Sequence, residues 1–145
     1  MDNQPQTDSS TLRIYIIGSF DNLSKIWGQL VQSAEPKTDL SKLLGMLLGC
    51  IGNGVVLIAE QDGEVFGFSA VERMDDDNCV IHTLPVAPAA LPCLKVIRLW
   101  AVDQGISHIK LVSQRLNGSN FRYIEKSLGF RREAMVFVQH VNLYA

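Results

Sequence analysis

Cysteine is scarce in this chain, and the few that occur do not indicate a structural staple. Cys50, Cys79 and Cys93 are odd in number, lie in apolar surroundings and show no C-x-x-C spacing. This pattern argues against a disulfide framework and against a zinc site. We therefore expect a reducing, cytoplasmic setting and no bound metal.

Long hydrophobic runs are also missing. No stretch approaches the roughly 18 apolar residues of a membrane span, and the start, MDNQPQTDSS, has neither a basic beginning nor an apolar signal core. We expect no membrane partner. A chain of 145 residues that is 47% hydrophobic can close one core without metal or disulfides. The expected organisation is a polar tail over residues 1–11 and a single domain over residues 12–145.

Basic residues are few in the first part of the chain. Residues 1–89 carry 5 Lys/Arg against 12 Asp/Glu, whereas residues 90–145 carry 8 against 3, so the two parts have charges of -7 and +5. Such polarity favours either an anionic ligand on the second part or head-to-tail association of identical subunits. No nucleic-acid-binding motif accompanies the basic residues, so we expect no nucleic-acid partner.

Strand-like segments are spread over the whole chain. LRIYIIG at residues 12–18 predicts a first strand, and residues 54–75 predict two strands joined at Asp62-Gly63, a strong hairpin signal. NCVIHTLPV at residues 78–86 predicts a fourth strand. Two more strands are predicted, one in HIKLVSQRL and a final one in FRREAMVFVQHVNLYA.

Helical spacing separates several of these strands. NLSKIWGQLVQSA predicts a helix capped by Asp21 or Asn22. TDLSKLLGMLLGCIG predicts a second helix, which is capped by Thr38 or Asp39 and is expected to pack closely at its glycines. A third helix ends near Gly105. GSNFRYIEKSLG predicts a fourth, short helix that begins at Ser119 or Asn120 and stops at Gly129. Because the third helix joins two strands, those strands should be parallel neighbours.

Glycine is absent from HTLPVAPAALPCLK at residues 82–95, where a strand passes into a helix. The order of elements around it, with SLGF at the last helix-to-strand corner, resembles the GNAT acetyltransferase family from Leu12 to about Val141. The resemblance implies an α/β (α+β) fold. Its sheet is mixed and mostly antiparallel, with parallel central strands four and five, and about four helices flank it.

The resemblance also implies where a cofactor would bind. In that family the fourth strand leads into a Q/R-x-x-G-x-G/A loop, whose N–H groups and following helix bind the pyrophosphate of acetyl-CoA. Here APAALPCLK stands in that place, without Gln, Arg or glycine. Pro88 and Pro92 lack an N–H donor. Without glycine, close approach of backbone to phosphate becomes costly.

Other family positions are matched unevenly. Asn117 matches an asparagine at the end of the fifth strand, and backbone amides near Leu84 and Val86 would hold pantetheine. The position four before Gly129 is Glu125 rather than the family's tyrosine. Tyr123 lies six residues before Gly129 and would serve as general acid only if the helix is shifted or bulged.

His82 on the fourth strand is the candidate general base, because an imidazole titrates near neutral pH. The plainer interpretation is a core histidine hydrogen-bonded to a neighbour. Glu60 on the second strand is either an acceptor-groove carboxylate or an exposed one. The cysteines are expected to be small buried hydrophobes rather than reactive thiols.

Two functions follow from these observations. The first is a catalytically degenerate acetyltransferase-like domain that binds no cofactor and acts as a protein-binding or assembly module, as a homo-oligomer or with another protein. NGSNFRY looks like a segment of acetyltransferase-like proteins of short-tailed phages, which would make it a virion component. The alternative is an active N-acetyltransferase that uses acetyl-CoA on an amine.

Overall fold

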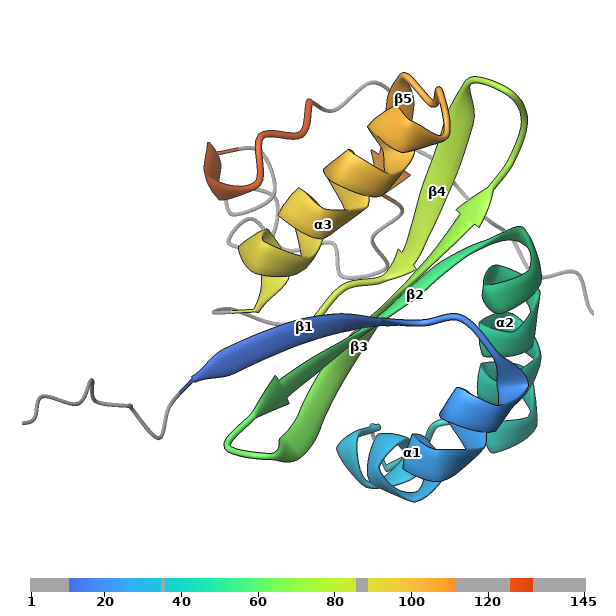
Figure 1. Ribbon diagram of the computed structural model, residues 1–145, viewed down its shortest axis with the longest axis vertical. Coiled ribbons are helices and arrows are strands. Elements are labelled where there is room, and N and C mark those ends of the chain that lie inside the picture. Colours follow the sequence, from blue (N-terminus) through green and yellow to red (C-terminus); the bar gives the residue numbers. More distant parts are fainter. Residues whose placement is uncertain (1–10, 35, 86–88, 112–125, 132–145) are drawn as a thin grey trace, which may run out of the picture. The chain divides into compact units, whose positions relative to one another are not determined.

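The computed structural model describes residues 11–34, 36–85, 89–111 and 126–131. The chain forms two compact units, residues 1–114 and 115–145. The first unit contains all the regular elements of Figure 1, and they follow one another as β1 (Leu12–Ile17), α1 (Phe20–Ser33), α2 (Leu40–Asn53), β2 (Gly54–Gln61), β3 (Glu64–Arg73), β4 (Asn78–Thr83), α3 (Ala90–Asp103) and β5 (His108–Leu111). No helix among the described residues is long and apolar enough to cross a membrane.

The sheet has five strands in the order β1-β2-β3-β4-β5. Neighbours from β1 to β4 are antiparallel, and β4 pairs with β5 in parallel from Asn78↔His108 to Ile81↔Leu111. The connection between these two strands is α3, as a parallel crossover requires. The expected mixed sheet with parallel fourth and fifth strands is confirmed.

Helices cover both faces of this sheet (Figure 1). Helices α1 and α2 pack on one face, where alternate residues of β2 such as Val56 and Ile58 join the buried side chains of Leu23, Leu30 and Leu47. The other alternate residues of β2, including Leu57, are also buried. A central strand buried on both faces reads as a continuous apolar run, which explains VVLIA in the sequence.

Local chemistry sets where the first two helices begin. Ser19 caps α1, because its Oγ accepts a hydrogen bond from the Asn22 N–H at 3.2 Å. The expected caps Asp21 and Asn22 are therefore wrong by two or three residues. Asp39 caps α2, because its side chain accepts hydrogen bonds from the N–H groups of Ser41 and Lys42. Asp39 is one of the two caps expected for this helix.

The hairpin between β2 and β3 turns at Asp62 and Gly63, as expected. Both residues have positive φ, 56° and 83°, which is the conformation that a two-residue hairpin turn with right-handed strand twist requires. Aspartate tolerates this region better than most residues, and glycine enters it without steric cost.

Glycines in α2 do not serve close packing. A Cβ atom on Gly45 or Gly49 would have no atom within 4 Å apart from the helix's own backbone, so the expected close approach there is wrong. The close approach occurs where α2 passes into β2. There a Cβ on Gly54 would lie 1.9 Å from the carbonyl oxygen of Val71.

The junction without glycine differs from expectation. The fourth strand stops at Thr83 rather than Val86, so Leu84 follows the strand, and Val86 lies outside the described residues. Helix α3 then begins at Ala90. Pro92 is thus the third residue of the helix, in the first turn, where a missing N–H breaks no intrahelical bond.

Only residues 126–131 of the second unit are described. Lys126 and Ser127 form a π-helical turn, Leu128 is buried, and Gly129 has a φ of 78°. A left-handed glycine after a helical turn is typical of a helix stop. The rest of the expected fourth helix and the last strand, together with Asn117 and Tyr123, lie outside the described residues.

Candidate functional site

The histidine singled out in the sequence forms a pair with a carboxylate. His82 Nε2 on β4 lies 2.9 Å from Glu72 Oε1 on β3. The side chain of His82 is 34% exposed and that of Glu72 is 38% exposed, so both are partly accessible to solvent. The interpretation of His82 as a core histidine is therefore wrong about its burial, although the hydrogen bond to a neighbour is present.

Strand alternation places His82 on the face of Glu72, and a β-bulge occurs at His82 itself. Ala70 pairs with Thr83 and Val71 pairs with Ile81, so that β4 carries one extra residue, His82, opposite no residue of β3. A bulged residue leaves the ladder, bends its strand and redirects its side chain, and bulges are common beside active sites. Cys79 and Ile81 are buried on one face of β4, and alternation places His82 on the other face, where the bulge leaves it without a partner residue on β3.

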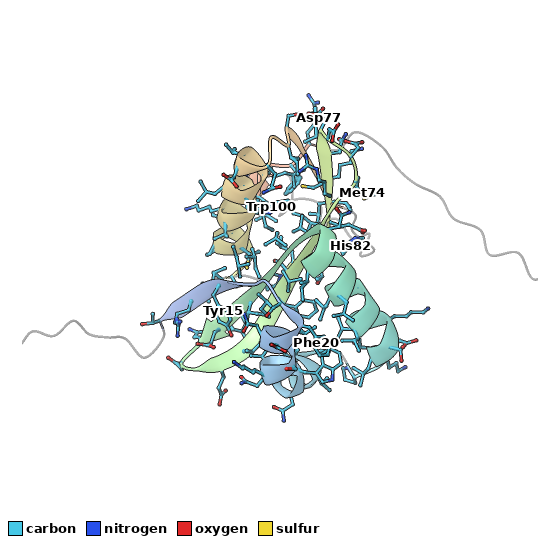
Figure 2. All side chains as sticks on the ribbon, turned by 45° about the vertical axis from the view of Figure 1, so that its right-hand side comes forward. Tyr15, Phe20, Met74, Asp77, His82 and Trp100 are labelled. Atoms are coloured by element: carbon cyan, nitrogen blue, oxygen red, sulfur yellow. The ribbon has the colours of Figure 1, made fainter. Side chains whose placement is uncertain are left out.

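The pair lies on the sheet face that carries α2. Glu72 acts electrostatically on the Cys50 thiol of that helix. The last residue of the helix, Asn53, donates its Nδ2 to the Arg73 carbonyl at 3.0 Å. In Figure 2, His82 lies beside the end of α2 that leads into β2. Met74, which follows β3 two residues after Glu72, is 60% exposed (Figure 2).

The beginning of α3 is the second part of the candidate site. Ala89 precedes the helix and makes no side-chain hydrogen bond to its first turn, so no side chain of the cap residue satisfies those N–H groups. The first three helical residues are Ala90, Leu91 and Pro92, and the proline has no N–H. Ala89 and Ala90 are buried, whereas Leu91 is half-buried. The helix end is suited to an anion, but it offers fewer donors than a glycine-rich loop does.

Glu60 is held by neighbours on the first strand. Its two carboxylate oxygens accept hydrogen bonds from Arg13 Nη1 and from the Tyr15 hydroxyl, each at 3.3 Å. Its side chain is 15% exposed. Burial and this carboxylate raise the pKa of Tyr15. Glu60 thus belongs to a structural cluster on β1 and β2.

A second histidine has polar partners that the sequence did not indicate. His108 Nδ1 lies 3.2 Å from Asp77 Oδ2 and 3.0 Å from Ser107 Oγ, and Ser107 also donates to Asp77. The hydrogen bond from Ser107 lowers the pKa of Asp77. A hydrolytic triad needs its hydroxyl and carboxylate on opposite ring nitrogens. Since both contact Nδ1 here, the cluster ties the starts of β4 and β5 together and is no triad.

The thiols are poorly suited to nucleophilic chemistry. Cys50, Cys79 and Cys93 are all buried, and burial raises the pKa of each. A thiol reacts as its thiolate, so these groups are inert near neutral pH. Within the described parts of the chain, no three His, Cys, Asp or Glu side chains are arranged to hold a metal ion.

Sequence reasoning found His82 and missed Glu72. The signal for Glu72 was present, because the two residues flank the acidic turn at residues 75–77 and the antiparallel pairing of their strands brings them within reach. The bulge at His82 left no such signal. Of the other proposed site residues, Leu84 lies between β4 and α3, while Val86, Asn117 and Tyr123 lie outside the described residues.

Solved structures similar to this chain are acetyltransferases. The aminoglycoside N-acetyltransferase AAC(6')-Iy, in complex with a CoA bisubstrate analogue, aligns with a TM-score of 0.69 at 15% identity over 92% of this chain and 100% of its own. AAC(6')-IG from Acinetobacter haemolyticus aligns with a TM-score of 0.61 at 15% identity, covering 90% of this chain and 99% of its own.

An acetyltransferase of Trypanosoma brucei gives a TM-score of 0.61 at 15% identity, over 90% of this chain and 100% of its own. No family model and no curated protein sequence matches the chain. At such low identity the likeness concerns the fold. The chain therefore has the GNAT acetyltransferase fold, as the order of its elements indicated.

Proposed function

We propose that this protein is an acetyl-CoA-dependent N-acetyltransferase that acts on an amine. The observation that carries the proposal is the His82–Glu72 pair, which projects from a bulge on the strand that begins the parallel β4–β5 pair. A base is needed because most amines are protonated near neutral pH and cannot attack a carbonyl in that form. Similar structures bind CoA and a CoA bisubstrate analogue, which supports the choice of donor.

The reaction needs one base and one acid. The ammonium group of the acceptor gives a proton to His82, and the freed nitrogen lone pair attacks the carbonyl carbon of the acetyl thioester. A C–N bond forms, the C–S bond breaks, and the sulfur leaves as the thiolate of CoA. That thiolate takes a proton from the Tyr123 hydroxyl, and the second proton, which the new amide nitrogen sheds, returns through water to the tyrosine oxygen.

The donor site would use the gap after β4. Backbone groups of Leu84 and Val86 would hold the pantetheine arm, and Asn117 would contact it from the segment that follows β5. The uncapped start of α3 would receive the pyrophosphate. The fit is incomplete, because Pro92 removes one donor and no glycine opens the loop. We therefore expect acetyl-CoA to bind more weakly than it would to a full glycine-rich loop.

One observation favours a second function. The shortage of N–H donors for phosphate at the start of α3 favours a catalytically degenerate domain. Such a domain would assemble with other proteins, for example in a phage virion. The acidic residues before position 90 and the basic ones after it would attract neighbouring copies, and the polar residues 1–10 would be ordered by such a neighbour. Association of this kind weakens as salt screens the charges.

Calorimetry with acetyl-CoA and with CoA separates the two functions. The enzyme predicts saturable heat and, with a panel of amines, an acetylated product that gains the mass of one acetyl group. It also predicts that His82→Ala abolishes turnover while acetyl-CoA still binds. No heat and no rise in melting temperature at millimolar acetyl-CoA would contradict the enzyme. In that case light scattering of the full chain and of a variant without residues 1–10, at low and high salt, tests assembly.

A further inference from the structure

We infer that Glu72 fixes the tautomer of His82, so that Nδ1 is the atom that accepts the proton from the acceptor amine. Glu72 is then a positioning residue. The statement about the tautomer rests on geometry alone, and only its catalytic consequence rests on the function proposed above.

Hydrogen-bond chemistry decides which ring nitrogen of His82 carries the proton. An ionised carboxylate has lone pairs and no proton, so it can only accept. With Glu72 Oε1 2.9 Å from His82 Nε2, the ring must donate through that atom. A neutral imidazole carries one proton on its two nitrogens. With Nε2 protonated, the free lone pair is on Nδ1, and Nδ1 is the basic atom.

Strand geometry holds the carboxylate in place. Glu72 pairs with Val80, two residues before His82 on β4, so the two side chains are diagonal neighbours on one face of the sheet. The bulge at His82 falls in the gap between the pairs Val71↔Ile81 and Ala70↔Thr83. Because both partners are on paired strands rather than on loops, the contact is set by backbone register.

The same contact has a consequence for catalysis. When Nδ1 takes up a proton, the ring becomes a cation, and its hydrogen bond to Glu72 becomes a charge-assisted one between opposite charges. The carboxylate therefore stabilises the ring in the state that follows proton transfer. It also keeps Nδ1 directed to the same place in every turnover. A histidine without this partner would populate both tautomers and more than one ring orientation.

Nitrogen NMR tests the tautomer directly. Long-range 1H–15N correlation of the full-length protein distinguishes a protonated ring nitrogen from a bare one, and His82→Asn assigns the signals. We expect wild-type His82, while neutral, to show protonated Nε2 and bare Nδ1. In Glu72→Gln the amide can donate as well as accept, so both nitrogen shifts should move toward the values of a mixture. Glu64→Gln, on the same strand but exposed at the hairpin, should leave them unchanged.

Kinetics test the catalytic consequence. Glu72→Gln should lower kcat by about 10- to 100-fold, less than the roughly 10²- to 10⁴-fold that a general base itself contributes, and leave KM for the amine within about threefold. Glu72→Asp keeps the charge but shortens the reach, and it should recover part of the lost rate if its shifts recover the wild-type pattern. Melting temperatures of all variants, measured alongside, show that they are folded.

Each outcome has a distinct meaning. A wild-type ring with protonated Nδ1, an even mixture of tautomers, or nitrogen shifts that Glu72→Gln leaves unchanged would overturn the inference. The expected shifts together with no acetyl transfer by the wild-type protein would leave the tautomer established and remove the proposed function instead. The expected shifts together with an unchanged kcat in Glu72→Gln would show that Glu72 does not assist the reaction.

Discussion

A Cβ atom on Gly54, the first residue of β2, would lie 1.9 Å from the main-chain carbonyl oxygen of Val71 on β3. The obstacle is backbone, so no side-chain rotation can relieve it. The strand pair must separate or shift to admit even a methyl group. Gly54 is thus required by the approach of two strands, at the point where α2 gives way to the sheet.

Gly54→Ala should destabilise the protein by about 3 kcal/mol, at the upper end of the cost of overpacking. Gly49→Ala, in the middle of α2 with nothing within 4 Å of its added methyl, is the matched control. It should stabilise by up to about 1 kcal/mol, because alanine has the higher helix propensity. Urea unfolding of both variants measures the difference. Equal effects of the two substitutions would contradict the close approach.

Asp39→Ala should cost about 1 kcal/mol, since it removes the side-chain acceptor for two N–H groups at the start of α2. Thr38→Ala at the preceding residue, where no cap bond is formed, should change stability by no more than about 0.5 kcal/mol. Thermal and urea unfolding give both values. A larger loss from Thr38→Ala than from Asp39→Ala would show that the cap has been assigned to the wrong residue.

Cys50 should make stability fall in alkaline solution. Burial, with a smaller effect from the Glu72 carboxylate, raises the pKa of its thiol from 9.0 to about 11. Between these values the unfolded chain releases a proton that the folded protein keeps, so alkaline pH favours unfolding. The contribution is fully present below about pH 9 and is lost as the pH rises toward 11.

The size of this effect is on the order of 2 kcal/mol, given about 1.4 kcal/mol per pH unit. It is measured as the difference in urea unfolding free energy between pH 8 and pH 11. Cys50→Ala has a lower stability at pH 8 because it leaves a cavity, but its decline with pH should be shallower than that of the wild type. Parallel declines in the two proteins would show that other groups cause the loss.

Pro92→Ala should tighten the binding of CoA about tenfold. The substitution adds an N–H to the first turn of α3, and one hydrogen bond to a charged group is worth about 1.5 kcal/mol. S-acetyl-N-acetylcysteamine, a thioester without phosphate, is the matched ligand, and its affinity should not change. Calorimetry measures both. An unchanged affinity for CoA would show that the pyrophosphate does not reach this end of α3.

Much of the fold was determined by local signals in the sequence. Asp62-Gly63 specified a hairpin because these two residues take up positive φ at little cost, and Asp39 specified a helix start because its side chain supplies an acceptor there. The helix between two β-rich segments specified parallel fourth and fifth strands, because a short turn cannot connect parallel strands. Each of these rules acts over a few residues or follows from chain connectivity.

The candidate site depended on contacts that no local rule contains. His82 stood out by residue type and strand position, yet only the register of β3 against β4, which pairs Glu72 with Val80, placed it against Glu72. Gly54 is likewise required by Val71, a residue seventeen positions away on a neighbouring strand. Sequence periodicity assigns residues to faces, whereas the register that decides which side chains meet across two strands, and any bulge in it, depends on the packing of the whole sheet. The sequence alone therefore determined the elements and their order, and the tertiary structure decided which side chains meet, because strand register and the approach of backbones are set only when the sheet is assembled.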